Sequence, residues 1–158
     1  MAAKLVLFLS VTVLVAGCAT PPLVVRNGDP AFAGKTVAMA VTEATPLDRA
    51  RHDEASARVM TELQSMDARL GEPAAADYLM QVAFAELPKG VGVMRDGAGG
   101  WLSEVRRRFG MRSPAYVVSI TAIETKTGKA AFSVTATGHA HGDPAKAVDQ
   151  LVTAALAD

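Results

Sequence analysis

The sequence predicts an α+β fold, a two-layer sandwich in which two helices cover one face of a four-stranded, mostly antiparallel sheet, in the order β-α-β-β-β-α. Three observations lead to this prediction. Several segments alternate bulky side chains with small or polar ones at a period of two, as half-buried strands do. Two other segments carry apolar side chains at helical spacing. A sheet with a single apolar face must bury that face, and amphipathic helices are its usual cover.

The first half of the domain contains a strand, a helix and a second strand. Residues 35–43 alternate and predict the first strand. Thr45 is a suitable N-cap for a helix that we expect to continue to about Leu70, with Gly71 as the glycine that ends it. Residues 76–87 alternate again and predict the second strand. The expected helix has one apolar stripe, formed by His52, Ala55, Val59, Leu63, Met66 and Leu70.

The second half contains a hairpin and a closing helix. Residues 116–123 and 130–137 both alternate, and the short segment between them contains Gly128, so they predict a β-hairpin. Asp143 is a suitable N-cap, and Pro144 suits the first position of the last helix. The apolar stripe of this helix would consist of Val148, Leu151, Val152 and Ala155.

The N-terminal segment predicts where the protein resides. An apolar run over residues 5–15 follows Lys4, and it is too short to span a bilayer, which needs roughly 20 apolar residues. The run ends in Val15-Ala16-Gly17-Cys18, which resembles the lipobox of bacterial lipoproteins. The alternative is an ordinary secretory signal with a chance cysteine near its cleavage site.

The lipobox resemblance implies a division of the chain. Residues 1–17 would be a lipoprotein signal peptide, residues 18–34 the lipidated cysteine and a tether, and residues 35–158 a single domain. Cys18 would carry diacylglycerol and an amide-linked acyl chain such as palmitate, and several chains together suffice to hold a protein on a membrane. In Gram-negative lipoproteins an Asp after the cysteine commonly signals retention at the inner membrane. Ala19 stands there in this chain, so we expect an outer-membrane lipoprotein facing the periplasm.

Composition excludes several other classes of function. The chain has 16 basic and 16 acidic residues, a balance that gives no reason to expect a nucleic-acid partner. Cys18 is the only cysteine, so its acylation would exclude disulfides, a cysteine nucleophile and thiolate metal sites.

Residues 88–114 interrupt the alternating pattern and form a predicted insertion rich in glycine and arginine. We expect a short helix from Trp101 to Phe109 within it. Tryptophan and arginine are the side chains most enriched at binding hot spots. The candidate contacts with an envelope protein or an anionic lipid are therefore Trp101, Arg106, Arg107 and Arg108. The alternative is a solvated or disordered surface insertion.

Sites for catalysis or cofactors have weaker support. His139 and His141 could bind a metal together with Asp143, but a solvated strand end explains them as well. His52 is best explained as a packed histidine at the edge of the helix stripe. The glycine-rich stretch GVGVMRDGAGG lacks the third glycine of a dinucleotide-binding turn. We therefore predict no metal and no cofactor.

The C-terminal part carries a family resemblance. The run SITAIETKTGKAAFSVTATGHA, followed by a capped amphipathic helix, resembles the small Gram-negative lipoproteins grouped as domain of unknown function 4136. The resemblance implies a lipobox, an early strand, a long helix, a second strand, a variable insertion and a hairpin, and it implies no specific activity. We expect a lipid-anchored envelope protein with a non-enzymatic binding or structural role. A hydrolase-like envelope enzyme with an unrecognised site is the alternative.

Overall fold

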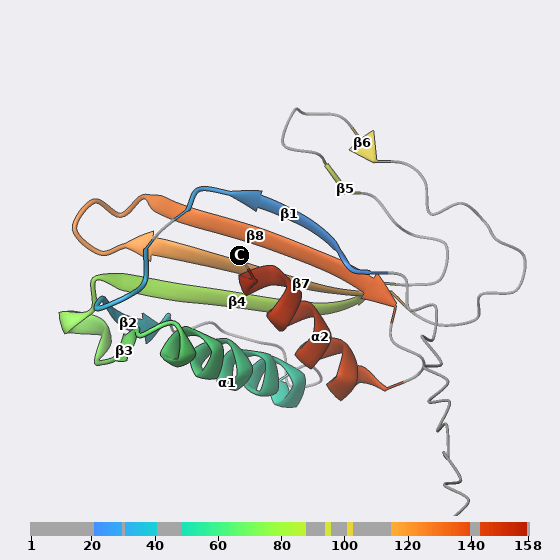
Figure 1. The fold of residues 1–158 in the computed structure, drawn as a ribbon, viewed down its shortest axis with the longest axis horizontal. Helices are drawn as coiled ribbons and strands as arrows, with labels where there is room; N and C mark the ends of the chain where they lie inside the picture. Colours follow the sequence, from blue (N-terminus) through green and yellow to red (C-terminus); the bar gives the residue numbers. More distant parts are fainter. Residues whose placement is uncertain are drawn as a thin grey trace, which may run out of the picture.

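The computed structural model confirms the α+β class and contains a larger sheet than predicted (Figure 1). Two helices lie on one face of an open, mixed sheet of six strands in the order β1-β8-β7-β4-β2-β3. A separate two-stranded sheet joins β5 and β6. The structure describes residues 21–29, 31–40, 49–87, 94–95, 101–102, 115–139 and 143–157. The elements are β1 (Leu23–Asn27), β2 (Thr36–Met39), α1 (Arg49–Ser65), β3 (Arg69–Leu70), a 3₁₀ turn (Pro73–Ala75), β4 (Tyr78–Leu87), β5 (Met94–Arg95), β6 (Trp101–Leu102), β7 (Ala115–Glu124), β8 (Ala130–His139) and α2 (Pro144–Leu156).

The centre of the sheet is the part that the alternating patterns predict. β4, β7 and β8 pair antiparallel over almost their whole lengths, and β7 and β8 form the predicted hairpin. β2 pairs parallel with β4 on one side and with β3 on the other, so the sheet is mixed. The two strands beyond the predicted four are β1 and β3.

The prediction of a tether over residues 18–34 is wrong from Leu23 onward. β1 pairs antiparallel with β8 in a register that places Leu23 opposite Thr137. Further along, Phe32 is 3% exposed and belongs to the core. The prolines and glycines that suggested a tether come before and after β1 in the sequence, and none lies within it. An edge strand such as β1 tolerates prolines at its ends.

The helix α1 ends earlier than predicted because the chain turns at Asp67, not at Gly71. Asp67 has a left-handed backbone with φ of 62°. The Ala68 N–H donates to the Leu63 carbonyl at 3.0 Å, and the Asp67 N–H donates to the Gln64 carbonyl at 3.1 Å. This pair of bonds is a Schellman motif, which usually uses glycine but tolerates Asp. The predicted N-cap Thr45 lies outside the described residues.

The core lies between the sheet and the two helices. Alternate residues of the strands enter it, including Val37, Met80 and Ile120, all 0% exposed. The stripe predicted for the first helix is buried at Ala55, Val59 and Leu63 and half-buried at His52, all on α1. Its last two members lie beyond α1, where Met66 is half-buried and Leu70, in β3, is exposed. On α2 the predicted stripe is buried throughout, at Val148, Leu151, Val152 and Ala155.

The ends of the helices are fixed by polar contacts. The predicted cap of α2 is confirmed, because an Asp143 carboxylate oxygen accepts from the Ala145 N–H at 3.1 Å and the Lys146 N–H at 3.4 Å. Between the helices, the Arg58 guanidinium lies 2.8 Å from the Asp149 carboxylate.

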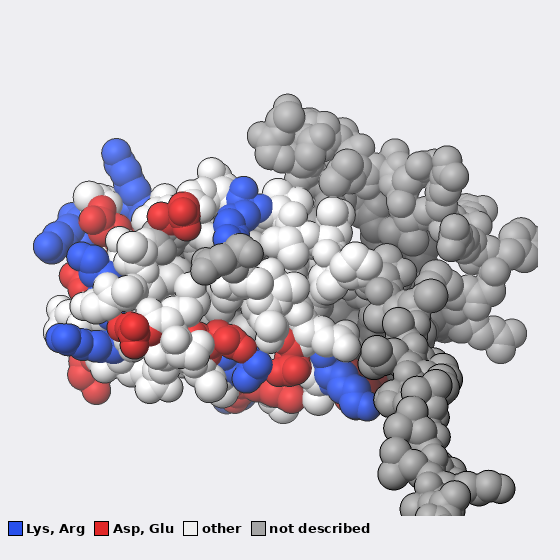
Figure 2. Space-filling view, in the orientation of Figure 1, with Lys and Arg blue, Asp and Glu red and all other residues white. Residues whose placement is uncertain are grey.

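Basic and acidic side chains are interspersed over the face shown in Figure 2, without a large patch of one sign.

Tyr116 is a buried aromatic side chain of the core, on the helix-covered face of β7. It is 2% exposed and stacks on Phe84 with ring centroids 5.7 Å apart. Burial raises the pKa of the Tyr116 hydroxyl above its usual range, and the nearby Glu86 carboxylate adds to the increase. Tyr116 therefore stays neutral as part of the core.

The domain has two distinct ends (Figure 1). At one end, which we call the insertion end, Leu87 pairs with Ala115, Ala115 pairs with His139, and β1 begins near the last residues of β8. Both helices begin at this end and run toward the opposite, hairpin end, where residues 125–129 connect β7 and β8. None of the described helices is long and apolar enough to cross a membrane.

Candidate binding site

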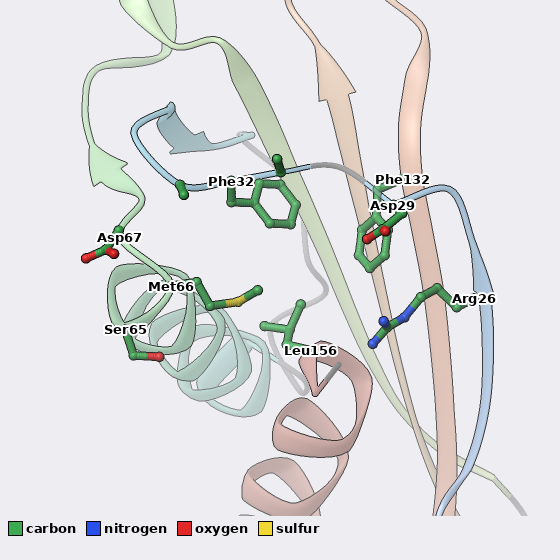
Figure 3. Close-up of a pocket in the computed structure, with 10 residues that line it drawn as sticks. Arg26, Asp29, Phe32, Ser65, Met66, Asp67, Phe132 and Leu156 are labelled. Atoms are coloured by element: carbon green, nitrogen blue, oxygen red, sulfur yellow. The ribbon is translucent and has the colours of Figure 1, made fainter.

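A cavity of about 450 Å³ lies where α1 and α2 end, toward the hairpin end of the domain (Figure 3). Four parts of the chain contribute to it: β1 with its connection to β2, the last turn of α1, β8, and the end of α2. Its lining residues are Arg26, Asp29, Ala31, Phe32, Ala33, Ser65, Met66, Asp67, Phe132 and Leu156.

The floor of the cavity is apolar and well packed. Phe32, Phe132 and Leu156 are buried, and Met66 packs against the core from the α1 side. The rings of Phe32 and Phe132 meet edge to face with centroids 5.9 Å apart, and Phe32 meets Tyr78 in the same way, also at 5.9 Å. These contacts are a favoured aromatic geometry, so the floor is pre-formed.

Arg26 supplies the cation of the cavity, and its guanidinium binds the end of α2. Its Nη2 donates to the Ala155 carbonyl at 3.0 Å and also to the Ala157 carbonyl. Carbonyls in the last turn of a helix have no partner within the helix, so Arg26 satisfies them. The guanidinium carbon also lies 5.9 Å from the centroid of Phe132, within the range of a cation–π contact.

Two exposed carboxylates, those of Asp29 and Asp67, stand on opposite sides of the cavity (Figure 3). Within the described part of the chain, neither carboxylate has an ion-pair or hydrogen-bond partner. The backbone holds Asp67 in place, because its carbonyl accepts from the Gly34 N–H at 2.9 Å. The partly negative C-terminal end of α1 also lies at this region, whereas the end of α2 is bound by Arg26.

None of the predicted site residues is among those that line this cavity. Cys18, Arg106, Arg107 and Arg108 are outside the described residues. The backbone of Trp101 is described: it belongs to β6 and lies opposite Arg95 of β5. The helix expected from Trp101 to Phe109 is therefore wrong at its first two residues, and the remainder lies outside the described part.

The histidines have different surroundings. His52 is half-buried on α1. His139 is exposed at the end of β8, and His141 is outside the described residues. The Asp143 carboxylate, a suggested metal ligand, caps α2 instead.

Sequence reasoning missed the cavity because it divided the lining between two wrongly assigned segments. Arg26, Asp29 and Phe32 fall in the predicted tether, and Met66 and Asp67 fall in the part of the predicted helix that extends too far. The short apolar run of residues 23–25, followed by an isolated phenylalanine among small residues, is the only signal, and a weak one, that could have identified the strand.

Comparisons with known proteins support the fold. No family model matches this sequence, and no curated protein matches it. Among solved structures, the chain is similar to PelC from Paraburkholderia phytofirmans, a dodecamer, with TM-scores of 0.54 and 0.52 in two crystals, 20% identity, and coverage of 85% of this chain and 94% of PelC. It is also similar to a PDZ domain protein from Parabacteroides distasonis, with a TM-score of 0.50, 12% identity, and coverage of 87% of this chain and 37% of that protein.

Proposed function

We propose that this protein is a lipid-anchored lipoprotein of the outer membrane that acts by binding or by building a structure, not by catalysis. Besides the lipobox, one observation from the structure supports a domain held close to the membrane. β1 begins at Leu23, so residues 19–22 alone separate Cys18 from the folded domain. The five residue steps from Cys18 to Leu23 span at most roughly 18 Å when fully extended. A lipid on Cys18 would therefore hold the domain close to the bilayer.

The position of β1 also supports one orientation of the domain on the membrane. The strand starts at the insertion end, so that end would face the bilayer. Residues 88–114 leave and rejoin the sheet at the same end, through Leu87 and Ala115. The proposal therefore assigns Trp101 and the arginines from Arg106 to Arg108 to contact with anionic lipid, with an envelope protein as the other possible partner.

The composition of the cavity supports binding over catalysis. Its lining combines a phenylalanine floor with isolated charges and contains no histidine or cysteine. The only hydroxyl in the lining, that of Ser65, donates to the Glu62 carbonyl at 2.6 Å. Apolar surfaces with a few placed charges are typical of binding sites.

The lipid anchor is tested by replacing Cys18 with Ser and fractionating cells. We expect Cys18→Ser to move the protein from the membrane pellet to the soluble fraction and to remove the acyl mass from the intact protein. Thr20→Ser, two residues later, is the matched control and should stay in the membrane. A Cys18→Ser protein that still pellets and is cut at the same site would contradict the proposal.

The similarity to the PelC dodecamer supports a further part of the proposal, that several copies assemble. We expect cyclic symmetry, because rotation about an axis along the membrane normal keeps every Cys18 anchor on the same side. Light scattering of the chain from residue 18 onward, carrying Cys18→Ser, should give a mass that is a multiple of the monomer. A monomer mass at every protein concentration would contradict assembly, and it would not bear on the lipid anchor at Cys18.

A further inference from the structure

We infer that the cavity at the ends of α1 and α2 binds a basic side chain, an arginine or lysine, presented by a partner protein. The inference rests on the proposed binding role and names the chemistry of the ligand. The volume of about 450 Å³ lies within the range of small-ligand sites, roughly 300–1,000 Å³. It is large enough to take one long side chain with part of its neighbours.

The electrostatics of the cavity favour a cation. Asp29 and Asp67 contribute two negative charges, while Arg26 is the only cation among the lining residues, all of which are described. Arg26 forms no ion pair with either carboxylate, and its Nη2 donates to the carbonyls of Ala155 and Ala157 at the end of α2. The formal charge of the lining is therefore −1, and the C-terminal end of α1 adds partial negative charge.

The floor of the cavity favours an apolar stem on that cation. Arginine and lysine carry three or four methylene groups, which cover apolar surface while the charged head stays at its edge. Here the accessible apolar surface is formed by the half-buried Met66 and the exposed Ala31 and Ala33, above the buried rings of Phe32 and Phe132, and the carboxylates stand at the rim. A bound side chain would lie on this surface and place its charged head near Asp29 or Asp67.

The position of the cavity favours a protein as the source of this side chain. The cavity lies toward the hairpin end, whereas β1 and residues 88–114 connect to the sheet at the insertion end. In the proposed orientation the cavity is therefore turned away from the bilayer. It would be open to proteins in the periplasm and not to lipid headgroups.

The test uses peptides that differ at one position. The chain from residue 18 onward, carrying Cys18→Ser, is titrated with N-acetyl-Leu-Arg-Leu-amide and followed by backbone amide shifts. We expect shifts confined to the cavity, with binding that weakens as salt is added. Replacement of the peptide arginine by citrulline keeps the shape and removes the charge, and it should weaken binding roughly tenfold. Equal binding of the two peptides would overturn the inference, as would stronger binding of a glutamate peptide.

Variants of the protein assign the binding to the two carboxylates. Asp29→Asn and Asp67→Asn together should weaken arginine-peptide binding roughly tenfold, and Asn tolerates the left-handed backbone at residue 67. Asp53→Asn, on the exposed side of α1, is the matched control and should bind as the unaltered chain does. Unchanged affinity in the double variant would overturn the assignment.

Butylguanidine, a small monocation with the same guanidinium and no peptide backbone, separates the two possible sources of the cation. Weaker binding of butylguanidine than of the peptide supports a protein partner, and equal binding would contradict that part of the inference. None of these measurements depends on the lipid, so their failure would leave the outcome of the Cys18→Ser fractionation intact.

Discussion

A chain that begins at Asp29 should be less stable by about 3–5 kcal/mol than a chain that begins at Ala19. The longer chain retains β1, and the shorter one lacks it. Removal of Val24 loses its packing against the core, worth about 1–2 kcal/mol. Removal of Arg26 leaves the last carbonyls of α2 without their donor, at about 1 kcal/mol for each hydrogen bond. The pairing of β1 with β8 is lost as well.

Urea denaturation of the two chains measures this difference. Arg26→Met in the longer chain is the matched partial change, because it keeps most of the stem and removes the two hydrogen bonds. It should cost about 1–2 kcal/mol. Equal urea midpoints for the two chains would show that β1 is a tether, as the sequence first suggested.

Gly28→Ala should be among the most damaging single substitutions, at about 3 kcal/mol or more. Gly28 has φ of 82°, and a Cβ atom there would lie 2.3 Å from the backbone oxygen of Ala131. The backbone of β8 cannot move away without disturbing its pairing with β1. The substitution therefore adds a steric clash to the usual cost of a left-handed backbone, about 1–2 kcal/mol.

Gly128→Ala is the matched control for this prediction. Gly128 also has a left-handed backbone, with φ of 68°, but nothing lies within 4 Å of an added Cβ atom. The substitution should lower the free energy of unfolding by about 1–2 kcal/mol, which is the cost of the left-handed backbone alone. Thermal or urea denaturation of both variants gives the comparison, and equal losses would mean that the chain does not approach β8 closely at Gly28.

The parts of the fold that were predictable from sequence are those with local signals. The hairpin of β7 and β8 has long alternation on both sides of Gly128, and α2 has its Asp143 cap and a regular apolar stripe. β1 and β3 lack such signals because they are short and depend on partners far along the chain. The end of α1 was misplaced because Asp67 takes a conformation that usually marks glycine, while the helical spacing continues to Leu70.

The cavity could not be predicted because no single segment contains its pattern. Its floor combines Phe32 with Phe132, and its rim combines Asp29 with Asp67. Only the pairing of β1 with β8 and the Schellman turn after α1 bring these residues together. The lipid site at Cys18 and the contact residues near Trp101 remain predictions from sequence.

The pairing of β1 with β8 also bears on how fast the chain can fold. The first described strand closes onto the last one, so Leu23 has to meet Thr137 across nearly the whole length of the domain. Contacts of such large sequence separation raise the contact order and slow folding. The hairpin and α2 can form earlier from neighbouring residues. Until β1 arrives, the edge of β8 is open to pairing with another chain, so a slow last step would make the nascent protein prone to aggregation.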